Sequence, residues 1–212
     1  MATDDMDALI VTDVQNDFLP GGALAVPRGD EIIPLVNVLQ EHFELVVATQ
    51  DWHPRGHVSF ASSHPGKKVF DKIMTGGIEQ VLWPDHCLQG SQGAEFAPGL
   101  STIRAEAIVR KGTNPAVDSY STFFDNARLK STGLEGYLKH KGVRRVFLCG
   151  LAADFCVYYS TMDALAAGFG VVFIKDATRA ISEQGLEAAE KAMRAKGGII
   201  AVAGDVPRLR ER

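Results

Sequence analysis

The run Val146-Phe147-Leu148-Cys149-Gly150 predicts a buried parallel β-strand, and a short turn separates it from Cys156. Two more apolar runs, at 8–12 and 107–110, lead directly into Asp13 and Lys111. Such runs alternate with helical patterns along the chain, which is typical of parallel βαβ units. The carboxyl ends of the strands line the ligand crevice in open α/β sheets. We therefore expect these three polar side chains to meet there.

The same alternation predicts the order of elements over most of the chain. Strands are expected at 8–12, 45–49, 107–110, 145–149, 171–175 and 199–202. Helices are expected at 30–41, 134–141, 154–167 and 182–196, with Asp154 and Ser182 as N-caps. Residues 207–212 are expected to form a charged tail, solvated or lightly docked. The predicted fold class is α/β, a three-layer α/β/α Rossmann-like domain with a six-stranded parallel sheet.

Residues 51–106 do not follow this rhythm, because they are dense in Gly, Pro, His and Trp and show little periodicity. A long irregular insertion in a compact domain is usually functional or disordered, and this aromatic content argues against disorder. We interpret the segment as a structured excursion that closes over the site. Because no linker or repeat is found, residues 1–212 are treated as a single domain with an insertion at about 51–106.

The bulk properties exclude several classes of protein. The formal net charge of −4 over 212 residues leaves no basic footprint for nucleic acid. No apolar stretch reaches the roughly 20 residues that a membrane span needs, and the acidic residues 1–7 do not resemble a secretory or mitochondrial signal. Three cysteines argue against a disulfide framework and for a reducing compartment. The cytoplasm is the predicted location.

Cys156 is the candidate nucleophile. It follows the expected start of a helix, whose partial positive charge and free amides favour a thiolate and can bind an oxyanion. The alternative is a buried structural cysteine, which is the assignment for Cys149. Asp13 has the alternative of capping a turn, and Lys111 that of a solvated strand end. Their common position at strand ends favours an acid, an ammonium and a thiol that together form an activated sulfur nucleophile.

Asp51, His53 and His86 are the candidate metal ligands. In an extended segment Asp51 and His53 project to the same side, and His86 lies in a second polar stretch, 83–87. One carboxylate and two imidazoles suit Zn²⁺, Fe²⁺ or Mn²⁺. The alternative is that these residues bind no metal, since other histidines lie between them. Cys87 is assigned to packing, with a metal role left open.

Four segments together carry a resemblance to the nicotinamidase branch of the isochorismatase-like cysteine hydrolases, over residues 8–203. The segments are 13–18 (DVQNDF), 49–54 (TQDWHP) with 83–87 (WPDHC) and 90–94 (GSQGA), 111–121 (KGTNPAVDSYS) and 150–157 (GLAADFCV). The resemblance implies hydrolysis of nicotinamide to nicotinate and ammonia through a cysteine thioester, and also deamidation of pyrazinamide.

The resemblance also implies roles for individual residues. Asp13 is the general base, Lys111 stabilises the ionised pair, and Cys156 is the nucleophile. The backbone amides of Ala152 and Cys156 form the oxyanion hole, and a cis peptide precedes Ala152. Substrate-binding residues are Phe18, Trp83 and Leu151. One divalent ion, with zinc preferred over iron or manganese, binds Asp51, His53 and His86 and takes the ring nitrogen of the substrate.

Some readings stay open. The family can have histidine eight residues after the ligand aspartate, where this chain has Ser59, so water would fill that position. Another amidase of the superfamily, acting on a carbamoyl or ureido substrate, is the nearest rival, and a non-catalytic metal- or ligand-binding relative is a further one. A dinucleotide-binding role is disfavoured because no Gly-x-Gly-x-x-Gly follows the first strand. The protein is expected to be a monomer or small homo-oligomer whose partner is the small-molecule substrate.

Overall fold

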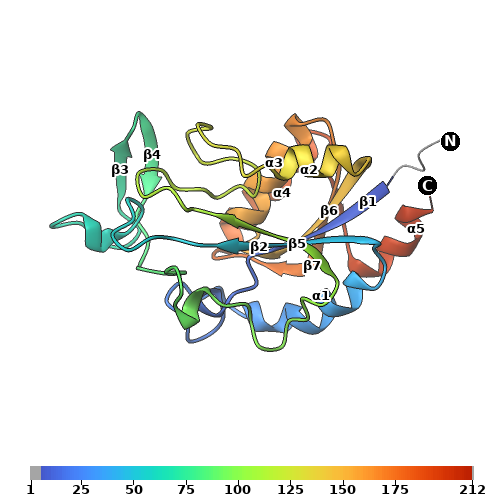
Figure 1. Cartoon of the computed structure of the whole chain (residues 1–212), viewed down its shortest axis with the longest axis horizontal. Helices are drawn as coiled ribbons and strands as arrows, with labels where there is room; N and C mark the ends of the chain where they lie inside the picture. Colours follow the sequence, from blue (N-terminus) through green and yellow to red (C-terminus); the bar gives the residue numbers. More distant parts are fainter. Residues whose placement is uncertain (1–5, 212) are drawn as a thin grey trace.

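The computed structural model describes residues 6–211, and its centre is a six-stranded sheet (Figure 1). The acidic residues 1–5 and Arg212, on which sequence predictions were made, lie outside the described residues. The strands of the sheet are β1 (Met6–Thr12), β2 (Leu45–Asp51), β5 (Ala105–Lys111), β6 (Val143–Leu151), β7 (Gly170–Arg179) and β8 (Ile199–Ala201). Their order is β5-β2-β1-β6-β7-β8, and all five pairings are parallel. The predicted fold class is confirmed.

Every strand begins where the sequence predicts or up to two residues earlier, and four of them extend further at the carboxyl end. This extension corrects one detail of the predicted site. Lys111 is the last residue of β5 rather than the first residue beyond it, and Asp51 is likewise the last residue of β2. Polar residues continue a strand here because their backbones still pair with the neighbouring strand, as Asp51 does with Lys111.

Two layers of helices cover the sheet. The helices are α1 (Ile33–Gln40), α2 (Leu134–His140), α3 (Cys156–Ala166), α4 (Glu183–Ala195) and α5 (Val206–Arg210). Figure 1 shows α1 and α5 on one side of the sheet and α2, α3 and α4 on the other. Two separate apolar clusters fill the spaces between these layers. Alternate residues of a strand face opposite sides, so Leu9 packs in one cluster and Ile10 in the other.

Two predictions about the helices and the tail need correction, and one about a helix cap is confirmed. The helix expected at 30–41 begins as a 3₁₀ turn, Gly29–Ile32, and becomes α-helical only at Ile33. The tail expected at 207–212 instead contributes to α5, which is docked through the fully buried Val206. Ser182 caps α4 as predicted, because its hydroxyl accepts a hydrogen bond from Gly185 N.

Asp154 does not cap a helix. α3 begins at Cys156 with Phe155 in the N-cap position and no side-chain cap. The carboxylate of Asp154 instead accepts hydrogen bonds from the backbone N–H groups of Ile181 (2.9 Å) and Ser182 (3.1 Å). Asp154 therefore joins the loop before α3 to the start of α4.

The insertion contains a β-hairpin, β3 (Lys72–Thr75) and β4 (Ile78–Val81), and is otherwise irregular. The hairpin lies beyond the carboxyl ends of the sheet strands, at the end of the molecule opposite the described termini (Figure 1). Short 3₁₀ turns occur at Asn16–Phe18, Ala61–Ser63, Gln92–Ala94 and Ala203–Asp205. Phe60, Trp83 and His53 in the insertion are buried, so this segment is packed as a structured part of the fold.

The strand order places a crevice between β1 and β6. From β1 the chain continues to β2 and β5 on one side, and it later returns to β6 and proceeds to β7 and β8 on the other. Ligands bind in open α/β sheets at this reversal of strand order, outside the carboxyl ends. Asp13 follows β1 and Ala152 follows β6, so both lie at the crevice. Within residues 6–211, no helix has the length and apolar character needed to cross a bilayer.

Candidate active site

Lys111 lies at the centre of the site, with its side chain fully buried. Its Nζ is 2.9 Å from Asp13 Oδ2, 3.0 Å from Asp51 Oδ1 and 3.5 Å from Cys156 Sγ. It also donates a hydrogen bond to the carbonyl of Ser119 at 2.9 Å. The structure thus brings Asp13, Lys111 and Cys156 together, and it adds Asp51 as a second carboxylate on the same ammonium group.

Asp13 is held in place by its backbone and by β2. Its φ of 47° turns the chain sharply after β1, a conformation that is uncommon outside glycine. Thr49 donates its hydroxyl hydrogen to Asp13 Oδ1 at 2.6 Å and accepts from Asp13 N at 3.2 Å. The second carboxylate oxygen is left for Lys111. Thr49, which the sequence did not single out, therefore orients the candidate base.

Burial governs the protonation of this group. Burial raises the pKa of Asp13, against the opposing effect of Lys111, and it raises the pKa of the Cys156 thiol well above its ordinary value, again against Lys111. Burial alone would lower the pKa of Lys111, but Asp13 and Asp51 raise it well above the usual range. Burial therefore opposes the effect of the helix N-terminus, which favours a thiolate. A thiol beside a carboxylate that accepts its proton is the arrangement that the burial favours.

Backbone N–H groups are available beside the sulfur. Cys156 is the first residue of α3, and its amide has no partner within the helix. The amides of Ala152 and Cys156 make no backbone hydrogen bond in the described turns and loops. The peptide between Leu151 and Ala152 is cis, as the resemblance implied. These two amides can therefore donate to an oxyanion formed at the sulfur.

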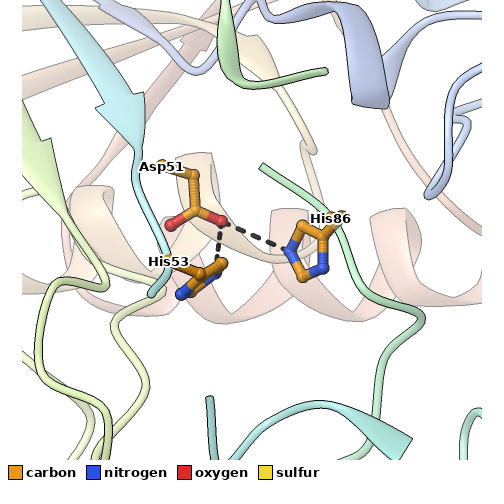
Figure 2. A group of neighbouring side chains, drawn as sticks. All are labelled: Asp51, His53 and His86. Carbon is orange, nitrogen blue, oxygen red and sulfur yellow. Dashed lines mark hydrogen bonds and ion pairs between the residues drawn. The ribbon is translucent and has the colours of Figure 1, made fainter. Parts of the chain in front are cut away.

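Asp51, His53 and His86 converge on one point, as Figure 2 shows. Asp51 Oδ2 is 2.9 Å from His53 Nε2 and 3.4 Å from His86 Nε2. His53 donates from Nδ1 to the carbonyl of Gly112 at 3.0 Å, and His86 donates from Nδ1 to that of Pro84 at 2.8 Å. Because a carbonyl only accepts, each Nδ1 carries a hydrogen, and each Nε2 faces the carboxylate.

Three electron-pair donors that face one another need a cation between them. Separations near 3 Å are those of neighbouring ligands around an ion with bonds of about 2.0–2.1 Å. The two backbone carbonyls supply the outer contacts that orient metal-binding histidines. Burial would raise the pKa of Asp51, but His53 and Lys111 outweigh it and lower the pKa well below the usual range. The donor set therefore fits a divalent transition metal.

Two further residues shape the metal-ligand group, and the sequence analysis missed both roles. Gln15 holds the backbone of Asp51, since its Nε2 donates to Asp51 O at 2.9 Å and its Oε1 accepts from Asp51 N at 2.7 Å. Gly112, with φ of 66°, passes so close that an added Cβ would lie 2.5 Å from His53 Cε1. A lysine-glycine pair after a strand was visible in the sequence, but not its proximity to His53.

His57 is a buried histidine that stacks on His53 at 4.3 Å between ring centroids. Ser59 donates to His57 Nδ1 from its backbone N (3.3 Å) and lies 2.7 Å from it through its hydroxyl. This leaves the ring hydrogen on Nε2, so His57 turns no lone pair toward the metal ligands. Burial lowers the pKa of His57 to about 4. Ser59 stands where the family can have a histidine, and in this structure it is hydrogen-bonded to His57.

A cavity of about 330 Å³, including its open mouth, lies between the sulfur and the metal ligands. Cys156, Asp51 and His86 line one part of it. Its other walls are largely aromatic and apolar: Phe18, Leu24, Trp83, Asp118, Tyr120, Ala152, Phe155 and Ile181. Two of the three expected substrate-binding residues therefore line the cavity. Leu151, the third, is fully buried in the core and is not among the lining residues.

Tyr120 and Phe155 are wall residues that the sequence did not identify. Trp83 meets Phe155 edge-on at 4.9 Å between centroids and donates its indole N–H to the Tyr120 hydroxyl at 3.3 Å. Tyr120 comes from the loop after β5 and Phe155 from the loop after β6, so only the folded chain brings them to Trp83. Aromatic walls of this kind suit a flat aromatic ligand.

Comparisons with known proteins agree with this arrangement. The family model of the isochorismatase domain matches residues 7–204. A nicotinamidase from Acinetobacter baylyi is 50% identical over 191 residues, covering 90% of this chain and 89% of that protein. Among solved structures, a nicotinamidase and pyrazinamidase of Acinetobacter baumanii superposes with a TM-score of 0.93 at 45% identity, covering 96% of this chain and 99% of that one. The pyrazinamidase of Pyrococcus horikoshii in complex with zinc has a TM-score of 0.77 at 39% identity, covering 93% and 99%.

Proposed function

This chain belongs to the isochorismatase family, and from that membership we infer that it is a nicotinamidase, a hydrolase that converts nicotinamide to nicotinate and ammonia. The observation that carries the inference is the pairing of two groups in one cavity. Cys156, beside Asp13 and Lys111, lines the cavity, and so do Asp51 and His86 of the Asp51-His53-His86 cluster. Such a pair acts on a carboxamide attached to a ring that carries a metal-binding nitrogen. Nicotinamide has both parts.

The reaction begins with a proton transfer. Asp13 accepts the proton of the Cys156 thiol, and Lys111, in contact with both, stabilises the resulting negative charge on sulfur. The thiolate attacks the amide carbon and forms a carbon–sulfur bond. The negative charge moves to the carbonyl oxygen, where the amides of Ala152 and Cys156 donate hydrogen bonds. Loss of one such donor typically raises the barrier by about 3 kcal/mol.

Asp13 then returns the proton to the amide nitrogen, the carbon–nitrogen bond breaks, and ammonia leaves a thioester on Cys156. Water attacks the thioester and gives up a proton to Asp13. The carbon–sulfur bond breaks, nicotinate is released, and the proton returns to sulfur. One carboxylate therefore serves as base in each half and as acid between them.

A divalent ion held by Asp51, His53 and His86 would bind the ring nitrogen of the substrate and thereby direct the carboxamide to the sulfur. The donor set and the zinc-bound state of the Pyrococcus horikoshii relative support such an ion. We propose zinc, with iron or manganese as alternatives. The protein's contribution is alignment, since Phe18 and Trp83 line the cavity that would take the ring.

We propose pyrazinamide as a second substrate. It also carries a carboxamide on an aromatic ring with a nitrogen in the meta position, so the same alignment applies. An amidase for a carbamoyl or ureido compound is the competing function, because it would keep Asp13, Lys111 and Cys156 but would not need an aromatic-walled cavity with a metal cluster. A cytoplasmic location and a monomeric or small homo-oligomeric state remain predictions.

The test is ammonia release from nicotinamide by the purified protein, before and after removal of metal by a chelator. We expect turnover that is lost on chelation and restored by zinc. Cys156→Ala should abolish turnover and retain the fold and substrate binding. Asp51→Ala should lose the metal, as measured by elemental analysis. Ammonia release from a carbamoyl or ureido compound, without any from nicotinamide, would overturn the assignment.

A further inference from the structure

Asp118 is a buried carboxylate with no role in the chemistry above. Its side chain is 3% exposed, and it lines the cavity together with Asp51 and Cys156. Its nearest potential cation is His53, with Nε2 at 3.9 Å from Asp118 Oδ1. Within residues 6–211, no ion pair joins it to a lysine or arginine. An unpaired buried carboxylate is costly, so its presence beside the metal ligands needs a compensating charge.

A count of buried charges in the cavity identifies that charge. Three buried carboxylates, those of Asp13, Asp51 and Asp118, face one buried ammonium group, that of Lys111. With the three carboxylates ionised, the thiol of Cys156 protonated and the neighbouring histidines neutral, these groups carry a formal net charge of about −2. Transfer of the thiol proton to Asp13 does not change this sum. One divalent cation neutralises it.

The geometry places Asp118 one step away from the ion. Asp51, His53 and His86 offer ligand atoms that lie within 4.8 Å of one another, and Asp118 is not a member of that group. Ligands of one ion with bonds of about 2 Å lie no more than roughly 4 Å apart. Asp118 Oδ1 lies at the upper end of that range from His53 Nε2, at 3.9 Å, and it does not share a group with Asp51 and His86. Asp118 therefore reaches the ion through a bridging molecule, and water is the molecule with hydrogens to donate to a carboxylate.

The surrounding contacts fix Asp118 in that position. Its Oδ1 accepts from Ser119 N at 2.8 Å, and its Oδ2 accepts from Gln80 Nε2 at 2.9 Å. Gln80 is fully buried on β4, and its Nε2 also lies 3.1 Å from the hydroxyl of Tyr120. Each carboxylate oxygen keeps a free lone pair. The hairpin of the insertion thus reaches the cavity through Gln80 and holds two of its wall residues.

A separate ion among His53, His57 and Asp118 is excluded by the hydrogen bonds of the rings. His57 Nδ1 accepts from Ser59, and His53 Nδ1 is committed to the carbonyl of Gly112. The remaining lone pair of His53 faces Asp51. No second ring lone pair is left for another ion.

We propose that Asp118 is the second carboxylate of the metal site: it accepts a hydrogen bond from a water ligand of the ion, positions that water and strengthens metal binding, while Gln80 positions Asp118. The proposal rests on the metal site of the proposed function and extends it to a residue outside the three direct ligands. Outer contacts of this kind typically change metal affinity by 10- to 100-fold.

The test is a competition titration with a chromophoric chelator, which gives the zinc dissociation constant of the metal-free protein. We expect Asp118→Asn to weaken zinc binding 10- to 100-fold, and zinc to raise its melting temperature less than that of the wild type. Asp125→Asn is the matched control. Asp125 is also buried in the loop after β5 and accepts from Leu129 N, but it does not line this cavity. We expect its zinc affinity to stay within twofold of wild type.

Gln80→Met provides a second, independent variant, since it keeps the carboxylate and removes its donor. We expect a smaller weakening of zinc binding, about three- to tenfold. If Asp118→Asn does not fold, the zinc affinity of Gln80→Met serves as the test. Wild-type zinc affinity in both variants would overturn the role of Asp118 and leave the nicotinamidase assignment intact. A wild-type protein that binds no divalent metal would overturn the metal site itself, and this proposal with it.

Discussion

Gly112 follows Lys111 directly and passes the metal-ligand group with no side chain. Replacement by alanine has two separable effects. The first is on the backbone, because φ is 66° and a left-handed conformation costs an alanine about 1–2 kcal/mol. The second is a collision, because the new Cβ would lie 2.5 Å from His53 Cε1, 2.7 Å from His53 Nδ1 and 2.8 Å from Asp51 Oδ1.

The size of the collision decides which property suffers. An ordinary contact of 3.4 Å requires the His53 ring to retreat by about 0.9 Å. His57 packs against the ring, tilted, at 4.3 Å between centroids and Phe60 lies edge-on at 5.5 Å, so these two rings restrict its movement. Metal sites tolerate deviations of about 0.2 Å in ligand distance. We therefore expect Gly112→Ala to weaken zinc binding more than tenfold. It should also lower the free energy of unfolding by about 2–5 kcal/mol, the sum of backbone strain and overpacking.

Gly142→Ala is the matched control. Gly142 has φ of 78°, and an added Cβ there meets no atom within 4 Å. This variant should lose only the backbone contribution of about 1–2 kcal/mol and keep its zinc affinity. The measurements are urea unfolding in chelator, followed by tryptophan fluorescence, and zinc competition titration. Equal loss of stability in the two variants, with unchanged zinc affinity in Gly112→Ala, would refute the reasoning.

Three other predictions follow from the buried charges. Asp13→Asn should reduce kcat/KM for nicotinamide by about 10²- to 10⁴-fold, as expected for loss of a general base. Burial raises the pKa of Asp13, so on acidification the wild-type kcat/KM should begin to fall at a higher pH than it would with an ordinary aspartate. More than a tenth of wild-type activity in Asp13→Asn would contradict the base role. Lys111→Met leaves Asp13 and Asp51 buried without their ammonium partner, so it should lower the free energy of unfolding of the metal-free protein by about 3–5 kcal/mol. A loss below about 1 kcal/mol in urea unfolding would show that these ion pairs contribute little to stability. His57 is neutral when folded, with a pKa lowered from 6.5 to about 4, so acid stabilises the unfolded state, in which the ring protonates first. The stabilisation from the neutral His57 ring is complete above pH 6.5, and the free energy of unfolding declines by about 2 kcal/mol by pH 5, as the pH falls toward 4. His57→Gln should lack this decline in metal-free protein. Identical profiles of unfolding free energy against pH for the two proteins would contradict it.

The succession of strands along the chain and the three residues of the thiol group could be predicted because their signals are local. A short apolar run that ends in a polar residue is visible without knowledge of its partners, and parallel strands bring their carboxyl ends to the same edge. This is why Asp13, Lys111 and Cys156 could be grouped although they are 98 and 45 residues apart in sequence. Asp51 and His53 likewise lie close because they are two positions apart in an extended segment and project to the same side.

Other features depend on contacts that local sequence does not encode. Asp154 has the residue type and position of a helix cap, but its carboxylate binds backbone amides 27 and 28 residues later. Leu151 lies in the nucleophile segment, yet the alternation of side chains in β6 turns it into the core. The sequence left residues 207–212 either solvated or lightly docked, and only the burial of Val206, at the start of α5, decides for docking.

The sequence by itself determined the α/β class, the succession of strands along the chain and the candidate reactive side chains, because hydrophobic runs and neighbouring polar residues are properties of short segments. The tertiary structure alone decided that Lys111 contacts Asp51 as well as Asp13, that Gly112 must lack a side chain, and that Gln80 of the hairpin holds Asp118 against the metal ligands. These facts depend on distances between segments 38 to 98 residues apart. Such distances are set by how the layers and the insertion pack, and no pattern within one segment contains them.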